Sequence, residues 1–258
     1  MKNAIASLIV VSMVVSGCFL FEKDSNAAGK KGRSVFFVGV DISGSFKRGK
    51  YFNDSLKFIS HYLYGHLRGI GGMARLGDLY VGAIGGAKPN EPKTFFPIQT
   101  FQYKGIPEIE SKLHEIFPKK RVNRFTDFNA FFRQITTFVK NKKLLMKPIT
   151  IILLTDGVPD TPKKNGEHDY RSFNLKPLEN LSRNITVRVL YTSAQIGMNW
   201  QEKVPRKRVK VWTQDANVMT DWKSKDIFQP KLKFEKKERL FDWIKDNVDF
   251  PVRKKRVN

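Results

Sequence analysis

Two apolar segments that each run directly into an aspartate constrain the fold of this chain most strongly. Residues 35–40, VFFVGV, precede Asp41, and the segment 149–157, ITIILLTDG, carries Asp156 directly after its apolar run. A continuous apolar run of this length is typical of a strand buried on both faces, as in a parallel sheet covered by helices. In such a sheet, ligands bind beyond the carboxyl ends of the strands. Both aspartates are therefore expected at the ligand-binding edge.

Other strands and helices alternate along the chain. The spacing of apolar residues predicts helices near 52–67, 109–116, 128–139 and 240–248. Further strands are predicted at 79–84, 94–101, 185–192 and 208–213, and Pro97 marks an edge strand. Full-length crossovers between strands predict an α/β fold with a doubly wound, mostly parallel central sheet flanked by helices.

The N-terminus predicts export. Lys2 precedes an apolar run at 4–15, which is too short for a comfortable membrane span and typical of a signal-peptide core. The run ends in VSGC at 15–18, which resembles the bacterial lipoprotein signal, in which cleavage leaves a lipidated cysteine. Cys18 is the only cysteine of the chain, so an internal disulfide is excluded. An uncleaved anchor and an incidental buried cysteine are the alternatives.

This interpretation divides the chain into three parts. Residues 1–17 are a lipoprotein signal peptide, residues 18–33 are the lipidated Cys18 with a flexible polar tether, and residues 34–258 are the folded domain. The resemblance implies a protein held by lipid in the bacterial cell envelope. Because Phe rather than Asp follows the cysteine, this resemblance favours the outer membrane in a bacterium that has two membranes.

The loop after the first predicted strand offers oxygen-bearing side chains at alternate positions, Asp41, Ser43 and Ser45. A turn explains only Ser45, as a cap for the next helix. A serine nucleophile needs a base, but the sequence has no Gly-x-Ser-x-Gly elbow and no histidine in a triad-like context. A hard divalent cation uses all three residues, because it prefers oxygen ligands.

Taken together, DISGS at 41–45 and LLTDG at 153–157 resemble the motifs of a von Willebrand factor A (VWA) domain, over residues 34 to about 250. This resemblance implies a metal-ion-dependent adhesion site (MIDAS). The ligands that it implies are Asp41, Ser43, Ser45, Thr126 and Asp156. The small, hydroxyl-rich site favours Mg²⁺, with Mn²⁺ and Ca²⁺ as alternatives.

The two threonines near these motifs have different predicted roles. Thr126 stands just before a strongly amphipathic helix, so a helix cap is the alternative to a metal ligand. Thr155 precedes Asp156, and strand alternation predicts that its side chain points away from the site.

The family resemblance implies a binding function without catalysis. Serine and threonine hydroxyls are neutral ligands, so the cation keeps net positive charge and attracts an Asp or Glu of a partner protein. The sequence thus predicts a membrane-anchored protein-binding module and not an enzyme. The partner itself stays unidentified.

Two alternatives remain. The chain carries 47 Lys and Arg against 24 Asp and Glu, a net charge of +23, which attracts anionic surfaces. Basic runs at 204–212, 231–239 and 252–258 predict contact with anionic lipid, lipopolysaccharide or, less readily, nucleic acid, unless they are solvated faces. Lys47, Arg48 and Lys50 are expected to widen the positive field at the metal. The triplet Glu167, His168 and Asp169 suggests a metal-assisted hydrolase.

Overall fold

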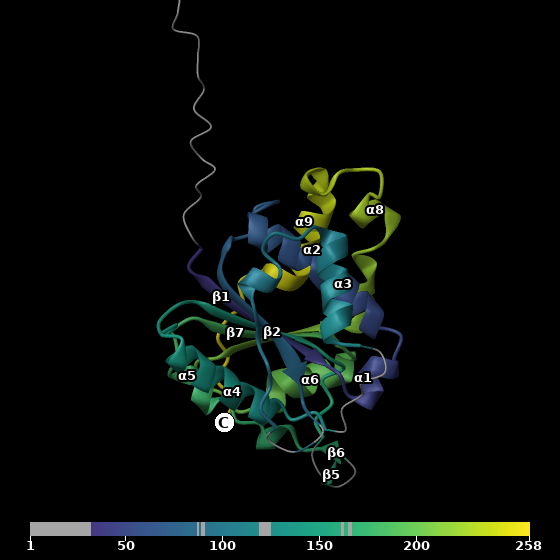
Figure 1. Ribbon diagram of the computed structural model, residues 1–258. Helices are drawn as coiled ribbons and strands as arrows, with labels where there is room; N and C mark the ends of the chain where they lie inside the picture. Colours follow the sequence, from purple (N-terminus) through teal and green to yellow (C-terminus); the bar gives the residue numbers. More distant parts are fainter. Residues whose placement is uncertain (1–31, 87, 89–90, 119–124, 161–162, 165–166) are drawn as a thin grey trace, which may run out of the picture. The chain divides into compact units, whose positions relative to one another are not determined.

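A computed structural model describes residues 32–86, 88, 91–118, 125–160, 163–164 and 167–258 (Figure 1). All of them belong to one unit, Lys31–Asn258. The predictions of a signal peptide and of lipidation at Cys18 lie outside the described residues, as does almost all of the tether. Within the described part of the chain, no helix is both long and apolar enough to cross a membrane.

The central element is a six-stranded sheet with the strand order β3-β2-β1-β4-β7-β8. Five strands are parallel: β1 (Ser34–Asp41), β2 (Leu76–Ile84), β4 (Ile149–Leu154), β7 (Ile185–Thr192) and β8 (Lys210–Asp215). The short strand β3 (Phe96–Pro97) pairs antiparallel with β2 at the edge. The predicted fold class, a doubly wound, mostly parallel α/β sheet flanked by helices, is confirmed.

Helices cover both faces of this sheet (Figure 1). One face packs against α2 (Phe52–Arg68), α3 (Ile106–Ile116), α7 (Ala216–Asp221) and α9 (Glu238–Ile244). The other packs against α4 (Phe128–Asn141), α5 (Lys176–Glu179) and α6 (Ala194–Lys203). The side chains of β1 alternate between the two cores, with Phe36 and Val38 in the first and Val35 and Phe37 in the second. This two-sided burial explains why the strand has no polar face.

Shorter elements complete the chain. They are α1 (Gly44–Arg48), α8 (Lys225–Phe228), the hairpin of β5 (Lys163–Lys164) and β6 (Glu167–His168), the 3₁₀ turns Ile98–Thr100, Tyr170–Ser172 and Phe234–Lys236, and a π turn, Lys245–Asp249, that extends α9. The strand predicted at 94–101 was wrong in length. Only two residues pair, and a 3₁₀ turn follows Pro97, which has no N–H to donate to a ladder.

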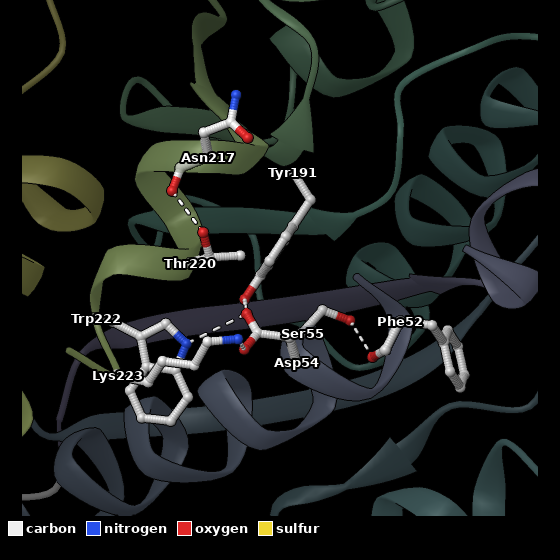
Figure 2. Close-up of polar contacts among 8 residues, drawn as sticks. All are labelled: Phe52, Asp54, Ser55, Tyr191, Asn217, Thr220, Trp222 and Lys223. Carbon is white, nitrogen blue, oxygen red and sulfur yellow. Dashed lines mark hydrogen bonds and ion pairs between the residues drawn. The ribbon is translucent and has the colours of Figure 1, made fainter. Parts of the chain in front are cut away.

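The beginning of α2 is fixed by one carboxylate. Asp54 accepts hydrogen bonds from Tyr191 Oη (2.9 Å) and Trp222 Nε1 (3.3 Å), and its other oxygen pairs with Lys223 Nζ at 2.6 Å (Figure 2). Tyr191 lies at an irregularity of the β7–β8 ladder and has a φ of 77°. The first turn of α2 is thereby tied to the end of β7 and to the segment after α7.

Candidate metal site

The two aspartates of the predicted motifs follow neighbouring strands. β1 and β4 are parallel partners in register, with Val40 beside Leu154. Asp41 is the last residue of β1, and Asp156 follows β4 by two positions. The structure therefore brings both carboxylates to the same edge of the sheet, close enough for the charge of Asp156 to act on Asp41.

Asp41 is fully buried, and both of its carboxylate oxygens accept hydrogen bonds. The Ser43 amide donates to Oδ1 at 2.8 Å, and the Thr155 hydroxyl donates to Oδ2 at 2.6 Å. Burial above all raises the pKa of Asp41 from 3.8 to about 6, and the neighbouring Asp156 adds to the rise. The hydrogen bonds from Thr155 and Ser43 oppose it. The carboxylate is thus held in place but is poorly compensated for its loss of water.

Thr155 corrects the sequence-based expectation. Its side chain was predicted to point away from the site, but its hydroxyl contacts Asp41. β4 ends at Leu154, so strand alternation no longer governs the next residue. The same hydroxyl accepts a hydrogen bond from the Gly157 amide at 3.0 Å. This contact was not predicted, although the sequence shows a threonine directly before Asp156.

The two serines of the loop lie side by side. Ser43 Oγ and Ser45 Oγ are 3.2 Å apart. Neighbouring ligands of an octahedral ion at about 2.1 Å lie about 3 Å from one another, so this spacing suits two ligands of one small cation. Ser45 lies within α1 and is exposed, whereas Ser43 occupies the N-cap position without a side-chain capping bond. The helix-cap interpretation of Ser45 was therefore wrong.

The turn after β4 depends on Gly157. Its φ is 77°, and a Cβ there would lie 2.9 Å from both Ile196 Cγ2 and Thr192 Cγ2. Its carbonyl accepts a hydrogen bond from Trp200 Nε1 at 2.8 Å. Asp156 Oδ1 accepts the Val158 amide at 3.0 Å. These contacts fix the turn that carries the second aspartate.

Thr126 lies on a third loop at this edge. The preceding residue, Phe125, forms an antiparallel bridge with Gly86, just after β2. The Thr126 carbonyl accepts the Asp160 amide at 3.4 Å. Asp127, not Thr126, caps α4, because its carboxylate accepts the Ala130 amide at 2.8 Å. The helix-cap alternative for Thr126 was therefore wrong, and among the described contacts its hydroxyl forms no hydrogen bond.

Among the described residues, no basic side chain pairs with either of the two aspartates. Lys47, expected to widen the positive field, is 8% exposed and donates to the Pro118 carbonyl instead. Arg48 and Lys50 are exposed.

The site also differs from a cluster of acidic, His or Cys ligands. No group of three or more His, Cys, Asp or Glu side chains among the described residues is placed to hold a metal ion. A cation at this edge would rely on two carboxylates and on hydroxyls, a donor set that suits a hard ion.

The triplet Glu167, His168 and Asp169, considered above for metal-assisted hydrolysis, lies in and directly after the β5–β6 hairpin. The Asp169 carboxylate accepts the Arg171 amide at 3.0 Å and begins a 3₁₀ turn. His168 Nδ1 is buried without a hydrogen-bond partner within the described structure. Asp169 thus has a structural role, and among the described contacts none joins His168 or Asp169 to Asp41.

Comparison with known proteins gives no family assignment. No protein-family model matches the chain, and no curated protein matches it. Among solved structures, manganese-loaded TRAP protein of Plasmodium vivax aligns with 74% of this chain and 71% of its own, at 16% identity and a TM-score of 0.46. Mussel proximal thread matrix protein 1, solved elsewhere with a zinc-occupied MIDAS motif, covers 74% of this chain and 46% of its own, at 14% identity and a TM-score of 0.45. Human Sec24c of the COPII coat covers 83% of this chain and 32% of its own, at 11% identity and a TM-score of 0.42.

Proposed function

We propose that this chain is a membrane-tethered module that binds an acidic side chain of a partner protein through one divalent cation. Asp41, Ser43, Ser45 and Asp156 would hold the ion, with Thr126 as a further ligand from the third loop. This is a binding function in which no bond is broken.

The observation that carries the proposal is the uncompensated pair of carboxylates. Asp41 is completely buried beside Asp156, and no lysine or arginine of the described chain pairs with either. Burying charge without a partner is costly, so proteins pair such groups or use them to hold metal ions. A divalent cation is the partner that this arrangement lacks.

The hydroxyls at the site decide what a bound ion can do. Ser43, Ser45 and Thr126 contribute oxygen without charge, so they leave the attraction of the ion for anions undiminished. An Asp or Glu of a partner supplies a further oxygen ligand and is drawn by that attraction. The hydroxyl-rich ligand set favours Mg²⁺, and Mn²⁺ and Ca²⁺ are the alternatives.

A cavity beside the site offers room for a partner. Its volume is about 230 Å³, and its lining includes Thr126, Asp127, Asn129, Asp160 and Phe173. We expect a neighbouring side chain of the partner to enter it while the acidic residue approaches the ion. The acidic lining favours a basic or amide-bearing side chain there.

The tether is a separate part of the proposal. A lipid on Cys18, in a bacterial envelope and preferentially on an outer membrane, would hold the domain through residues 18–33. Incorporation of labelled fatty acid into the parent chain and not into Cys18→Ser tests this part by itself.

Partner capture tests the binding function. Envelope extracts are passed over the parent chain, Asp41→Ala and the control Asp242→Asn, each with Mg²⁺ or with a chelator. Asp242 is an exposed acid on α9 that is neither a proposed ligand nor part of the cavity lining. The proposal predicts a protein retained by the parent and the control with Mg²⁺ only. Equal retention under all conditions would contradict it.

A further inference from the structure

The end of the sheet opposite the candidate metal site is where the chain enters the domain. Val35, at the start of β1, donates its amide to the Pro148 carbonyl at 2.9 Å. Ile149, at the start of β4, donates to the Asn184 carbonyl at 2.9 Å. The entry of β1, the α4–β4 loop and the α5–β7 loop are therefore neighbours. In Figure 1 this end, with α5 and the C-terminus, lies on the left, whereas α1 lies on the right.

Two large apolar side chains are exposed on the α4–β4 loop. Leu145 is 46% exposed and Met146 is 67% exposed. The loop is held in this shape: Leu144 is buried and Met146, with a φ of 66°, donates its amide to the Leu181 carbonyl at 2.8 Å. A left-handed backbone at a residue other than glycine persists only where its surroundings enforce it. The fold thus presents an apolar pair outward at a fixed position.

Basic side chains surround this pair. Lys142 and Lys143 precede it on the same loop, and Arg183 lies on the α5–β7 loop beside it; all three are exposed. Lys210 Nζ bonds Asn184 Oδ1 at 3.0 Å, and Arg208 bonds Asn180 Oδ1 at 3.3 Å, which places the start of β8 at the same end.

The C-terminal tail joins the same surface. Arg206 and Val257 form an antiparallel bridge, with both N–H to O distances at 2.9 Å. The exposed residues 253–256, RKKR, therefore lie next to the exposed Lys207 and Arg208. Two of the basic runs seen in the sequence, 204–212 and 252–258, are thus one surface in space. Arg206 itself is buried and bonds carbonyls at the end of α6, so it belongs to the core.

Two acidic groups near this surface are already engaged. Asp78 pairs with Lys147 at 2.9 Å. Glu179 is buried, and its Oε1 accepts the amides of Lys207 and Arg208. Neither carboxylate cancels the charge of the exposed lysines and arginines.

We propose that this surface docks the domain on anionic phospholipid. Leu145 and Met146 enter the interface, and the surrounding lysines and arginines contact the headgroups, as apolar anchors flanked by basic residues do on membranes. The metal site then faces away from the membrane toward a partner. The proposal relies on the proposed tether only for the side from which the membrane approaches, and it is independent of the metal. A central apolar pair favours a bilayer over nucleic acid.

A site-specific fluorophore tests the docking. Cys18→Ser removes the only cysteine, so the full-length chain can carry one environment-sensitive label at Leu145→Cys or at the control Met198→Cys. Met198 is 53% exposed on α6, on the flank of the domain. With phosphatidylglycerol vesicles, the emission of the label at 145 is expected to shift to the blue and to be quenched by spin-labelled lipid, while the label at 198 changes little. Chelator should have no effect.

Charge variants and a second polyanion complete the test. Lys142→Glu, Lys143→Glu and Arg208→Glu together should abolish the shift at 145, whereas Lys231→Glu, Lys233→Glu and Lys236→Glu, exposed lysines outside this surface, should preserve it. Vesicles of phosphatidylcholine, or salt of about 0.5 M, should also reduce it. Equal signals at 145 and 198, absent vesicle binding, or a response to duplex DNA but not to vesicles would each overturn the proposal. If the parent chain incorporates no labelled fatty acid at Cys18, only the proposed tether is contradicted, and the docking proposal stands.

Discussion

Thr155 donates a 2.6 Å hydrogen bond from its hydroxyl to Oδ2 of Asp41, and this bond joins the ends of β4 and β1 at a fully buried carboxylate. Because Thr155 Oγ1 also accepts the Gly157 amide, one hydroxyl connects the first aspartate to the turn that carries the second. The two motifs, more than a hundred residues apart in the chain, therefore act as one structural unit.

Thr155→Val removes this donor while keeping the shape of the side chain. The Asp41 carboxylate then loses one of its two hydrogen bonds inside the core, so we expect the free energy of unfolding to fall by about 1–3 kcal/mol in the presence of chelator. Urea denaturation measures it. Thr136→Val is the matched control, because that buried hydroxyl bonds only a carbonyl of its own helix, Phe132, at 2.9 Å. Equal losses for the two variants would contradict the role given to Thr155.

The pKa of Asp41 predicts how the metal-free domain responds to pH. Its value of about 6 in the folded protein lies above 3.8, so the folded state holds the proton more tightly than the unfolded chain does. The contribution of this group to stability is therefore full below about pH 4 and is lost as the pH rises through 6, by at most roughly 3 kcal/mol. Asp41→Asn should remove this part of the pH dependence.

Added Mg²⁺ should oppose the same loss, because the cation stabilises the ionised carboxylate. Unfolding curves from about pH 4 to pH 8, with Mg²⁺ or chelator, measure both effects. A parent protein with the same pH dependence as Asp41→Asn would show that the ionised Asp41 is not strained by burial.

Gly157→Ala tests the turn after β4. The substitution forces alanine into a φ of 77° and places its Cβ 2.9 Å from Ile196 and Thr192. We expect a loss of about 2–4 kcal/mol of folding free energy together with weaker cation binding. Gly72→Ala is the control: its φ is 75°, but no atom lies within 4 Å of the added Cβ. It should lose only about 1 kcal/mol, the cost of the backbone conformation. Equal effects would mean that packing against Gly157 is unimportant.

The Asp54 cluster in Figure 2 gives a prediction about the first turn of α2. Asp54→Ala leaves Tyr191 and Trp222 without their shared acceptor, so we expect a loss of about 2–4 kcal/mol by thermal or urea unfolding. Tyr191→Phe removes one bond and should lose about 1 kcal/mol. An Asp54→Ala variant that is as stable as the parent would show that the cluster does not stabilise the protein.

The sequence allowed the sheet, its main helices and the two aspartates at its edge to be predicted, because these depend on local apolar patterns. Apolar periodicity gives no sign of α6, since only Gly197 and Trp200 of its ten residues are buried. The cap at Asp127 and the contact of Thr155 with Asp41 depend on where a strand or helix ends, within one residue. The basic runs 204–212 and 252–258 were visible in the sequence, but their union in one surface could not be predicted, because the bridge between Arg206 and Val257 joins segments that are distant in the chain.

The central claim is that Asp41, Ser43, Ser45 and Asp156 hold one divalent cation, and calorimetric titration with Mg²⁺ near pH 7 tests it most directly. The account predicts a single binding site in the parent chain, abolished in Asp41→Asn and Asp156→Asn and retained in Asp160→Asn. Binding that persists unchanged in Asp41→Asn, or a parent chain that binds neither Mg²⁺ nor Mn²⁺, would contradict it.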